Sequence, residues 1–466
     1  MRTVAAAIDP QGRLPTIAVA VLGALTAVAF GTLVPTAPEA AIVLVALVPL
    51  ALFAPVASLA VVLFLTAIVP FDVQNRLAVS GGEGVPGLLA VDVLVLVGLS
   101  RVAALVLLRR LQPAVPLLLA AGLALVFAIA LVEGVARGAD ASDAGTEGRR
   151  LFFGVAAFML AWPIVGDERR QRRLLGVLLA LGLALGLWGL TQWFFGVDYS
   201  ESGDVGVRPG VDLTSGGRGQ LQGGLYAFPV AVTLSFAALL LHRFEAAALR
   251  RLVAAVLVLN VVCLVLTYER TFWAATVLSC ALVALWGGRD ALRRVIRWLP
   301  VGVVALLVAV AASGPGEIRT AAQRLTSVTK YRADSAVEYR KSESTAVAHA
   351  IKERPLTGSG LGATITWGET GVFATTTTPF SHVGYLWLAW KLGLPAAVMV
   401  VLALGAAAAS RRRSPDHWLG VLSSASRAAL VGVLLISVTF PAFNALGATA
   451  VIGVLAAMAV RPASRA

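Results

Sequence analysis

His382 is the best-placed titratable side chain in the sequence, within the segment Pro-Phe-Ser-His-Val-Gly-Tyr at 379–385. It stands where a long hydrophilic segment returns to an apolar one, beside Tyr385 and Trp387. A neutral imidazole at such a place can deprotonate a hydroxyl near neutral pH, because the ordinary pKa of histidine is about 6.5. The alternative is a histidine that only caps the following helix.

Two arginines at the edges of apolar runs could bind an anion. Arg218 lies in Gly-Gly-Arg-Gly-Gln, just before the apolar run at 221–241, and Arg270 lies in the short connection Tyr-Glu-Arg-Thr-Phe-Trp. A guanidinium is permanently charged and offers paired donors, which suit a diphosphate. The alternatives are a local ion pair with Glu269 for Arg270 and a solvated loop charge for Arg218.

Arg340 is a third candidate, inside the 68-residue segment 314–381 that separates two apolar runs. A helix is predicted over about 334–353, since its apolar spacing is helical and Pro355 follows. A charge on the less polar face is costly unless it is paired, and Glu343 lies one turn away. That face carries Arg340 together with Val337, Ser344, Val347 and Ile351.

The rest of the segment 314–381 shows three further patterns. Apolar residues at 318–325 recur with helical spacing, residues 357–362 (Thr-Gly-Ser-Gly-Leu-Gly) predict a turn, and the four threonines at 375–378 predict an irregular stretch. The glycine stretch follows no strand and opens no helix, which argues against a nucleotide-binding loop.

The elements that carry these residues belong to a membrane protein. Of the 466 residues, 58% are hydrophobic and 14% charged, with a mean hydropathy of +0.86. Soluble proteins have about 45–50% apolar and about a quarter charged residues. The net charge of +13 would fit a nucleic-acid partner, but no basic face with aromatic residues or groove-binding motif accompanies it, so no nucleic acid is expected.

Fourteen apolar runs approach the roughly 20 residues that a helix needs to cross the hydrocarbon core. The arginine-rich connections fall on one side of the membrane when fourteen spans are counted, which predicts that this side, with both termini, is cytoplasmic. The predicted class is therefore an all-α, multi-pass membrane protein. The runs are 16–34, 39–54, 56–70, 87–108, 114–132, 150–166, 173–195, 221–241, 252–267, 271–287, 298–313, 386–409, 418–439 and 443–460.

Metal and cofactor chemistry have little support in the sequence. Cys263 and Cys280 both lie within apolar runs and form no metal-binding pattern. The acidic segment 133–149 is interpreted as a solvated connector, and Asp92, inside a predicted span, as a proton relay or a buried hydrogen-bonding group. We expect no metal and no cofactor.

Four motifs, in order and on one predicted side of the membrane, resemble the O-antigen ligase and polymerase family of bacterial membrane glycan transferases. They are the arginine-glycine stretch at 218–223, the arginine that opens a span at 269–273, the glycine stretch at 355–362, and a histidine block formed by His382, Val383, Leu386 and Gly393. The resemblance extends from about residue 39 to the C-terminus. Val383 departs from the usual asparagine, and Lys391 stands where an acid is frequent.

The resemblance implies that a glycan moves from a polyprenyl-diphosphate donor to an acceptor hydroxyl outside the cytoplasmic membrane. His382 would be the general base, and Arg218, Arg270 and Arg340 would bind the donor diphosphate, without a metal. The acceptor would be a glycan, a lipid or a cell-wall polymer, and membrane lipids would surround the helices. The implied organisation is spans 1–11 in residues 1–313, a lid over 314–381, and three last spans in 382–466.

A transporter or flippase of lipid-linked sugars is the alternative function. Fourteen spans suit such a protein, and Asp92, Arg101 and Arg427 fall within or near spans. Transporters, however, are usually built from repeated halves with polar sites at the midplane. Here no repeat is found and the polar candidates gather at the predicted outer boundary.

Overall fold

The structure is a computed structural model, and it describes most of the chain from residue 47 onward. The described ranges are 47–69, 89–108, 110–111, 114–195, 225–242, 244, 246–267, 269–297, 335–368, 376–410 and 417–460. Arg218, the helical spacing at 318–325 and the predicted spans 16–34 and 298–313 lie outside these ranges.

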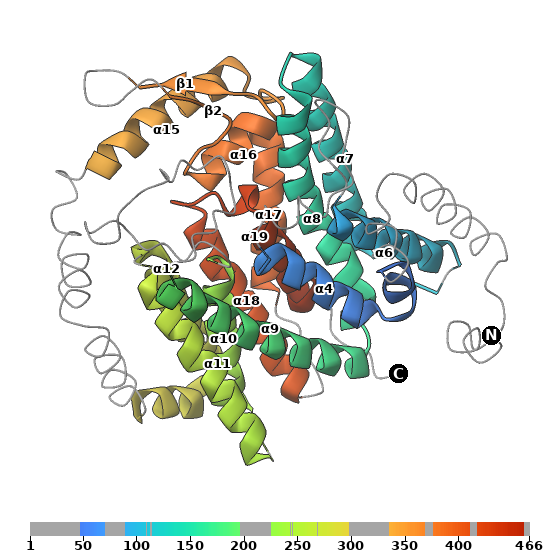
Figure 1. Cartoon of the computed structure of the whole chain (residues 1–466), viewed down its shortest axis with the longest axis vertical. Helices are drawn as coiled ribbons and strands as arrows, with labels where there is room; N and C mark the ends of the chain where they lie inside the picture. The colour runs from blue at the N-terminus through green and yellow to red at the C-terminus, as the bar shows by residue number, and fades with distance from the viewer. Residues whose placement is uncertain are drawn as a thin grey trace.

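The described chain is almost entirely helical, with one small hairpin (Figure 1). The helices of the first half are α4 (Pro55–Ala67), α6 (Ala90–Leu107), α7 (Val115–Ala136), α8 (Ala141–Val165), α9 (Glu168–Phe195) and α10 (Ala227–Leu241). Then follow α11 (Ala247–Leu266), α12 (Arg270–Trp286), α15 (Ser335–Glu353), α16 (Gly384–Leu392), α17 (Leu394–Ala409), α18 (His417–Ile436), the 3-10 turn η3 (Ala442–Asn444) and α19 (Leu446–Val460).

Within the described ranges, five helices are long and apolar enough to cross a membrane: α6, α7, α8, α9 as far as Thr191, and α11. Six shorter apolar helices accompany them, namely α4, α10, α12, α17, α18 from Gly420, and α19. The chain is therefore an all-α membrane protein. The count of fourteen spans stays a prediction.

The helix bundle is built around close contacts between small residues. A Cβ added to Gly453 of α19 would lie 2.1 Å from the carbonyl oxygen of Gly154 in α8, so the two backbones touch there. Close approach at glycine is the usual basis of helix packing in membranes, where lipid removes the hydrophobic drive for association. Because α19 is buried along nearly its whole length, it forms the centre of the bundle.

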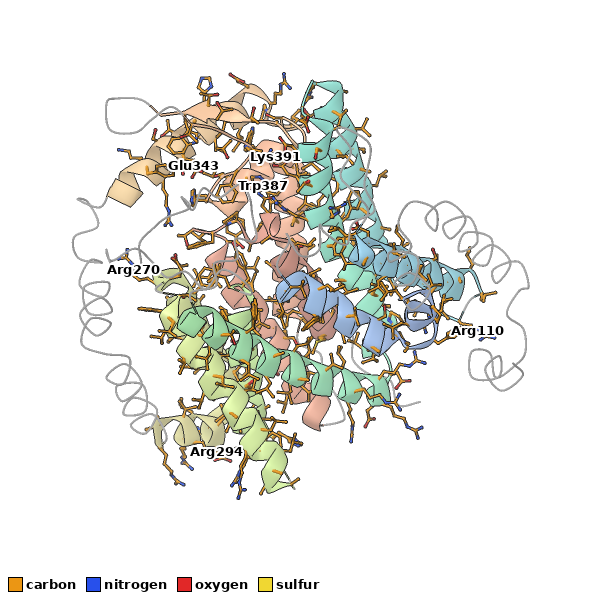
Figure 2. All side chains as sticks on the ribbon, viewed as in Figure 1. Arg110, Arg270, Arg294, Glu343, Trp387 and Lys391 are labelled. Carbon is orange, nitrogen blue, oxygen red and sulfur yellow. The ribbon has the colours of Figure 1, made fainter. Side chains whose placement is uncertain are left out.

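Two groups of helices meet at this centre. In Figure 1, α7 and α8 run side by side at the upper right, while α10, α11, α12 and α18 form the lower left part. The helix α15 and the hairpin lie together at the upper left, next to α16. Arg294 lies near the lower end of the same view, away from Glu343 and Lys391 near the upper end (Figure 2). Which end faces the cytoplasm stays a prediction.

The predicted single span 386–409 was wrong, because a break at Gly393 divides it into α16 and α17. Gly393 has a φ of +80°, which an L side chain rarely adopts. A Cβ there would lie 2.2 Å from the carbonyl oxygen of Leu356. The hydrophilic segment thus passes directly against the break, which a continuous helix would not allow.

The interpretation of 133–149 as a solvated connector was also wrong. Helix α7 continues to Ala136 and α8 begins at Ala141, so only a short turn is left between them. The Asp140 carboxylate caps α8 by accepting hydrogen bonds from the backbone N–H groups of Ser142 and Asp143 at 2.8 and 3.2 Å. The small and acidic residues of this segment mark a helix start.

Three of the four threonines were wrongly expected to be irregular, while Thr375 lies outside the described ranges. Strand β2 (Thr376–Thr378) pairs antiparallel with β1 (Ile365–Trp367), and Thr366 lies opposite Thr377. The hydroxyl oxygens of these two residues are 2.9 Å apart. β-branched threonine suits such a pair of strands, and the hairpin adds a small β element to the all-α protein.

Asp92 has structural partners inside the bundle. Its carboxylate lies 3.2 Å from the guanidinium of Arg149 and accepts a 2.8 Å hydrogen bond from the backbone N–H of Leu89, at the start of α6. Of the two interpretations of Asp92, these contacts favour the buried hydrogen-bonding group over the proton relay.

Candidate active site

The glycine stretch 357–362 fastens the hydrophilic segment to the bundle. Gly358, Gly360 and Gly362 have φ values of +75°, +85° and +78°. A Cβ on any of them would lie within 2.9 Å of backbone atoms from another element. The backbones that approach are those of Lys391 and Gly393 for Gly358, Gly134 for Gly360, and Ala144 for Gly362. Glycine is therefore required by packing at three alternate positions.

Backbone hydrogen bonds hold this stretch between α7 and α16. Ser359 donates to the carbonyl oxygen of Trp390 at 2.7 Å, and Gly360 donates to that of Lys391 at 3.1 Å. On the other side, Leu361 donates to the carbonyl oxygen of Ala130 at 3.0 Å. The expectation of a structural turn is confirmed, because these backbone donors bind protein carbonyls.

Lys391 forms a buried ion pair beside the glycine stretch. Its side chain is 0% exposed, and its Nζ lies 2.8 Å from the carboxylate of Glu147 in α8, which is 3% exposed. Nζ also donates to the carbonyl oxygen of Ala363 at 2.6 Å. The other Glu147 oxygen accepts a 2.6 Å hydrogen bond from the backbone N–H of Gly362. The departure at position 391 thus has a partner that the sequence analysis placed in solvent.

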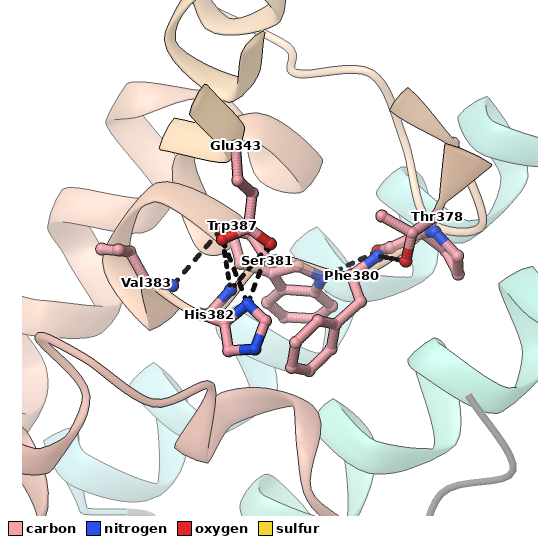
Figure 3. Close-up of polar contacts among 8 residues, drawn as sticks. Glu343, Thr378, Phe380, Ser381, His382, Val383 and Trp387 are labelled. Carbon is pink, nitrogen blue, oxygen red and sulfur yellow. Dashed lines mark hydrogen bonds and ion pairs between the residues drawn. The ribbon is translucent and has the colours of Figure 1, made fainter. Parts of the chain in front are cut away.

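His382 lies immediately before α16, and its ring contacts a buried carboxylate (Figure 3). Its Nδ1 lies 3.1 and 3.2 Å from the two carboxylate oxygens of Glu343, a residue of α15 that is 1% exposed. The backbone N–H of His382 donates to the same oxygens at 3.3 and 3.2 Å. The N-cap of α16 is Val383, which makes no side-chain cap. The histidine side chain is therefore held by Glu343 and does not cap the helix.

Aromatic rings form the walls around the imidazole. Phe380 and Tyr339 meet the His382 ring edge to face, with centroid distances of 5.0 and 5.8 Å. Tyr339 in turn packs at 4.3 Å against Trp367 of β1. Burial first, and then the charge of Glu343, raise the pKa of Tyr339 above its ordinary value, so its hydroxyl is neutral. The imidazole is 23% exposed and stays accessible.

The segment 437–440, between α18 and η3, connects α12 with α16. The Thr439 hydroxyl donates to that of Thr271 in the first turn of α12 at 2.9 Å. The carbonyl oxygen of Ser437 accepts a 2.9 Å hydrogen bond from Gly384, at the start of α16. The residue next to Thr271 is Arg270, which begins α12 and lies at its upper end in Figure 2. The segment 437–440 therefore contacts both the first turn of α12 and the start of α16, the helix that follows His382.

Arg340 reaches the same segment from α15. Its guanidinium carbon lies 5.5 Å from the ring centroid of Phe440, a cation–π contact. The Phe440 ring also packs at 4.9 Å against Phe272 of α12. The pairing of Arg340 with Glu343 that the sequence allowed is not formed, because Glu343 is bonded to His382.

Residues 255–401 match the family model described as O-antigen ligase. This segment belongs to the O-antigen ligase family. The match runs from α11 into α17 and includes Arg270, Arg340, Glu343 and His382. It supports an O-antigen ligase-like glycan transferase that uses lipid-linked glycans in general. A search of the curated proteins found no match to the chain.

Glu343 is the residue of the O-antigen ligase domain that the sequence analysis weighed only as a partner for Arg340. It lies four residues before Val347 and eight before Ile351, and all three are buried. Residues four apart share a helix face. An acid in register with a buried stripe signals a buried partner, and that signal was present in the sequence.

In the described part of this ligase-like chain, no group of three or more histidine, cysteine, aspartate or glutamate side chains could hold a metal ion. Metal independence and the roles of Arg218, Arg270, Arg340 and His382 stay predictions.

Proposed function

We propose that the protein moves a glycan from a polyprenyl-diphosphate donor to an acceptor hydroxyl at the outer face of the cytoplasmic membrane, without a metal. The observation that carries the proposal is the His382–Glu343 pair inside an O-antigen ligase domain. The segment 437–440, which contacts the first turn of α12 and Arg340, lies against the start of α16.

His382 acts as the general base in this proposal. Its Nε2 takes the proton of the acceptor hydroxyl while the hydroxyl oxygen attacks the anomeric carbon of the donor. The bond between that carbon and the diphosphate oxygen breaks with inversion, and polyprenyl diphosphate leaves with the electron pair. A positioned base of this kind contributes about 10²–10⁴ in rate. In Figure 3 the edge of the His382 imidazole that lies opposite Nδ1 points away from Glu343. This orientation supports the approach of an acceptor to that edge.

Arg270, Arg340 and Arg218 stabilise the negative charge that builds on the leaving diphosphate. Charge stabilisation by groups already in place is usually the largest catalytic contribution. Arg270 stands in the first turn of α12, where backbone N–H groups and the helix dipole also favour an anion. Arg340 stacks on Phe440, and the Phe440 ring packs against Phe272 in the same first turn of α12.

The donor's lipid tail has an apolar pocket between α4, α9, α10 and α19. The pocket is lined by residues such as Leu63, Leu181, Val230 and Leu455. Two of its lining residues, Ile68 and Leu185, belong to the apolar cluster that contains Phe272 and contacts Phe440. The cluster thus runs from the pocket to the turn that carries Arg270, which supports a lipid tail bound there with its diphosphate at the arginines.

Transfer by the purified protein in proteoliposomes tests this function. Given a defined polyprenyl-diphosphate glycan and a panel of glycan, lipid and cell-wall acceptors, we expect glycosylated acceptor and free polyprenyl diphosphate in equal amounts, unaffected by a metal chelator. The acceptor that reacts separates ligase from polymerase. Net movement of donor across the bilayer without transfer would instead establish the transporter.

Arg270→Lys is expected to lower kcat/KM about 10- to 100-fold. Lysine keeps the charge but loses the paired donors that bind two oxygens of a diphosphate, and hydrogen bonds to charged groups contribute about 1.5–3 kcal/mol. Initial transfer rates at several donor concentrations measure the effect. Arg293→Lys is the matched control, since Arg293 is 78% exposed and follows α12 at its other end. Equal rates for both variants would leave Arg270 without a role in donor binding.

A further inference from the structure

We propose that Glu343 is the positioning residue of the transfer reaction, and that it holds the His382 imidazole with its basic Nε2 free for the acceptor. This inference rests on the proposed function, because it assigns a partner to the base that the function requires. It concerns a residue of the hydrophilic segment 314–381, whereas the base itself precedes a membrane helix.

The contacts of Glu343 fix His382 at two points. One carboxylate binds both Nδ1 of the ring and the backbone N–H of the same residue, with all four distances between 3.1 and 3.3 Å. Two anchors, one on the backbone and one on the ring, leave the imidazole little freedom about its side-chain torsions. The rings of Phe380 and Tyr339 pack beside the imidazole and limit its rotation further.

The chemistry of the carboxylate fixes the tautomer of His382. An ionised carboxylate only accepts hydrogen bonds, so the neutral imidazole must carry its hydrogen on Nδ1. Nε2 then holds the lone pair that removes the proton from the acceptor hydroxyl. When Nε2 takes that proton, the ring becomes positively charged and the adjacent carboxylate stabilises it, the role that aspartate has in a serine-histidine-aspartate triad.

Burial argues that Glu343 is placed for this task. A carboxylate that is 1% exposed is costly in free energy, and an apolar residue on the stripe of Val347 and Ile351 would pack at lower cost. Glu343 donates nothing and has its described hydrogen bonds with His382 alone. The Glu343 charge therefore contributes to binding His382 and not to the packing of α15.

The packing of α15 places Glu343 beside His382. The carboxylate comes from α15, which packs on α16 and β1, while the glycine stretch after α15 is tied to α7 and α16. Both anchors of His382 therefore depend on the position of α15 against α16.

The charged and titratable groups around the imidazole are few in the described part of the chain. From α15 these are Glu343, the neutral Tyr339 and Arg340, whose guanidinium lies over Phe440. From the segment 437–440 the contacts are made by hydroxyl and aromatic groups. Loss of the Glu343 charge should thus act on His382 directly, without a second carboxylate to compensate.

The experiment compares Glu343→Gln and Glu343→Asp with Glu353→Gln in the full-length protein in proteoliposomes. Glu353 pairs with His349 at 3.3 Å on the same helix, but both side chains are more than half exposed, so it is a matched control. Glutamine can still accept from Nδ1 but carries no charge. We expect Glu343→Gln to lower kcat on the order of 10²-fold with KM nearly unchanged, Glu343→Asp to be intermediate, and Glu353→Gln to match wild type.

Separate values of kcat and KM distinguish this role from a structural one. A KM that rises as much as kcat falls in Glu343→Gln, or a loss of rate that follows only the melting temperature in both Glu343 variants, would overturn the inference. If His382→Ala itself transfers normally, the proposed function has failed at the base; if only the Glu343 variants behave as wild type, this inference alone has failed.

Discussion

His382→Ala is expected to reduce glycan transfer by at least about 10²–10⁴-fold, the contribution of a positioned general base. Among the described residues, no other side chain in contact with the imidazole can replace it, because Tyr339 is neutral with a raised pKa, Phe380 has no titratable group, and the Glu343 carboxylate is buried. Initial rates with purified protein, donor and a reactive acceptor measure the loss. Donor binding should stay near wild type, since the diphosphate contacts are assigned to arginines.

The control for this variant is His349→Ala. His349 lies on α15 with its side chain 76% exposed, and its only role in the described structure is a surface pair with Glu353. This variant should keep full activity. Membrane insertion and melting temperature of both variants show whether the fold is intact. Near-normal transfer by well-folded His382→Ala would remove His382 from the chemistry and leave only the family assignment.

Lys391→Met is expected to lower the free energy of unfolding by about 3–5 kcal/mol, because it leaves the Glu147 carboxylate buried without its cation. The variant also removes the hydrogen bond to the carbonyl oxygen of Ala363, which helps to hold the glycine stretch. Thermal or denaturant unfolding in detergent measures the change. Since the glycine stretch follows α15, we also expect reduced transfer at temperatures where the protein is still folded.

The double variant Lys391→Met with Glu147→Met isolates the ion pair. Removing both charges leaves an apolar contact of similar volume, so most of the loss should be recovered. Arg172→Met is the matched control, since Arg172 forms a 2.7 Å pair with Glu168 but is 55% exposed, and its loss should cost at most about 0.5 kcal/mol. Additive losses in the double variant would contradict the assignment of a stabilising pair.

The sequence by itself determined the class of the protein and most helix positions in the described part of the chain. Apolar runs and helical spacing are local properties, so the predicted helix at 334–353 is nearly identical to α15 (Ser335–Glu353), and the predicted span 271–287 to α12 (Arg270–Trp286). The four motifs and their order indicated the O-antigen ligase family, and the match of residues 255–401 to the family model confirms it. Each of these inferences depends on neighbours within a few turns.

Only the tertiary structure decided which groups meet. Glu343 contacts His382, which lies 39 positions later in the sequence. Lys391 pairs with Glu147, which belongs to α8, a helix far earlier in the chain. The break at Gly393 likewise depends on the carbonyl of Leu356 passing against it. Local periodicity carries no information on such pairs, because a buried charge is tolerated only where the fold brings its partner. The sequence pointed to His382 as a candidate base, and only the packing of α15 against α16 showed that the Glu343 carboxylate contacts it.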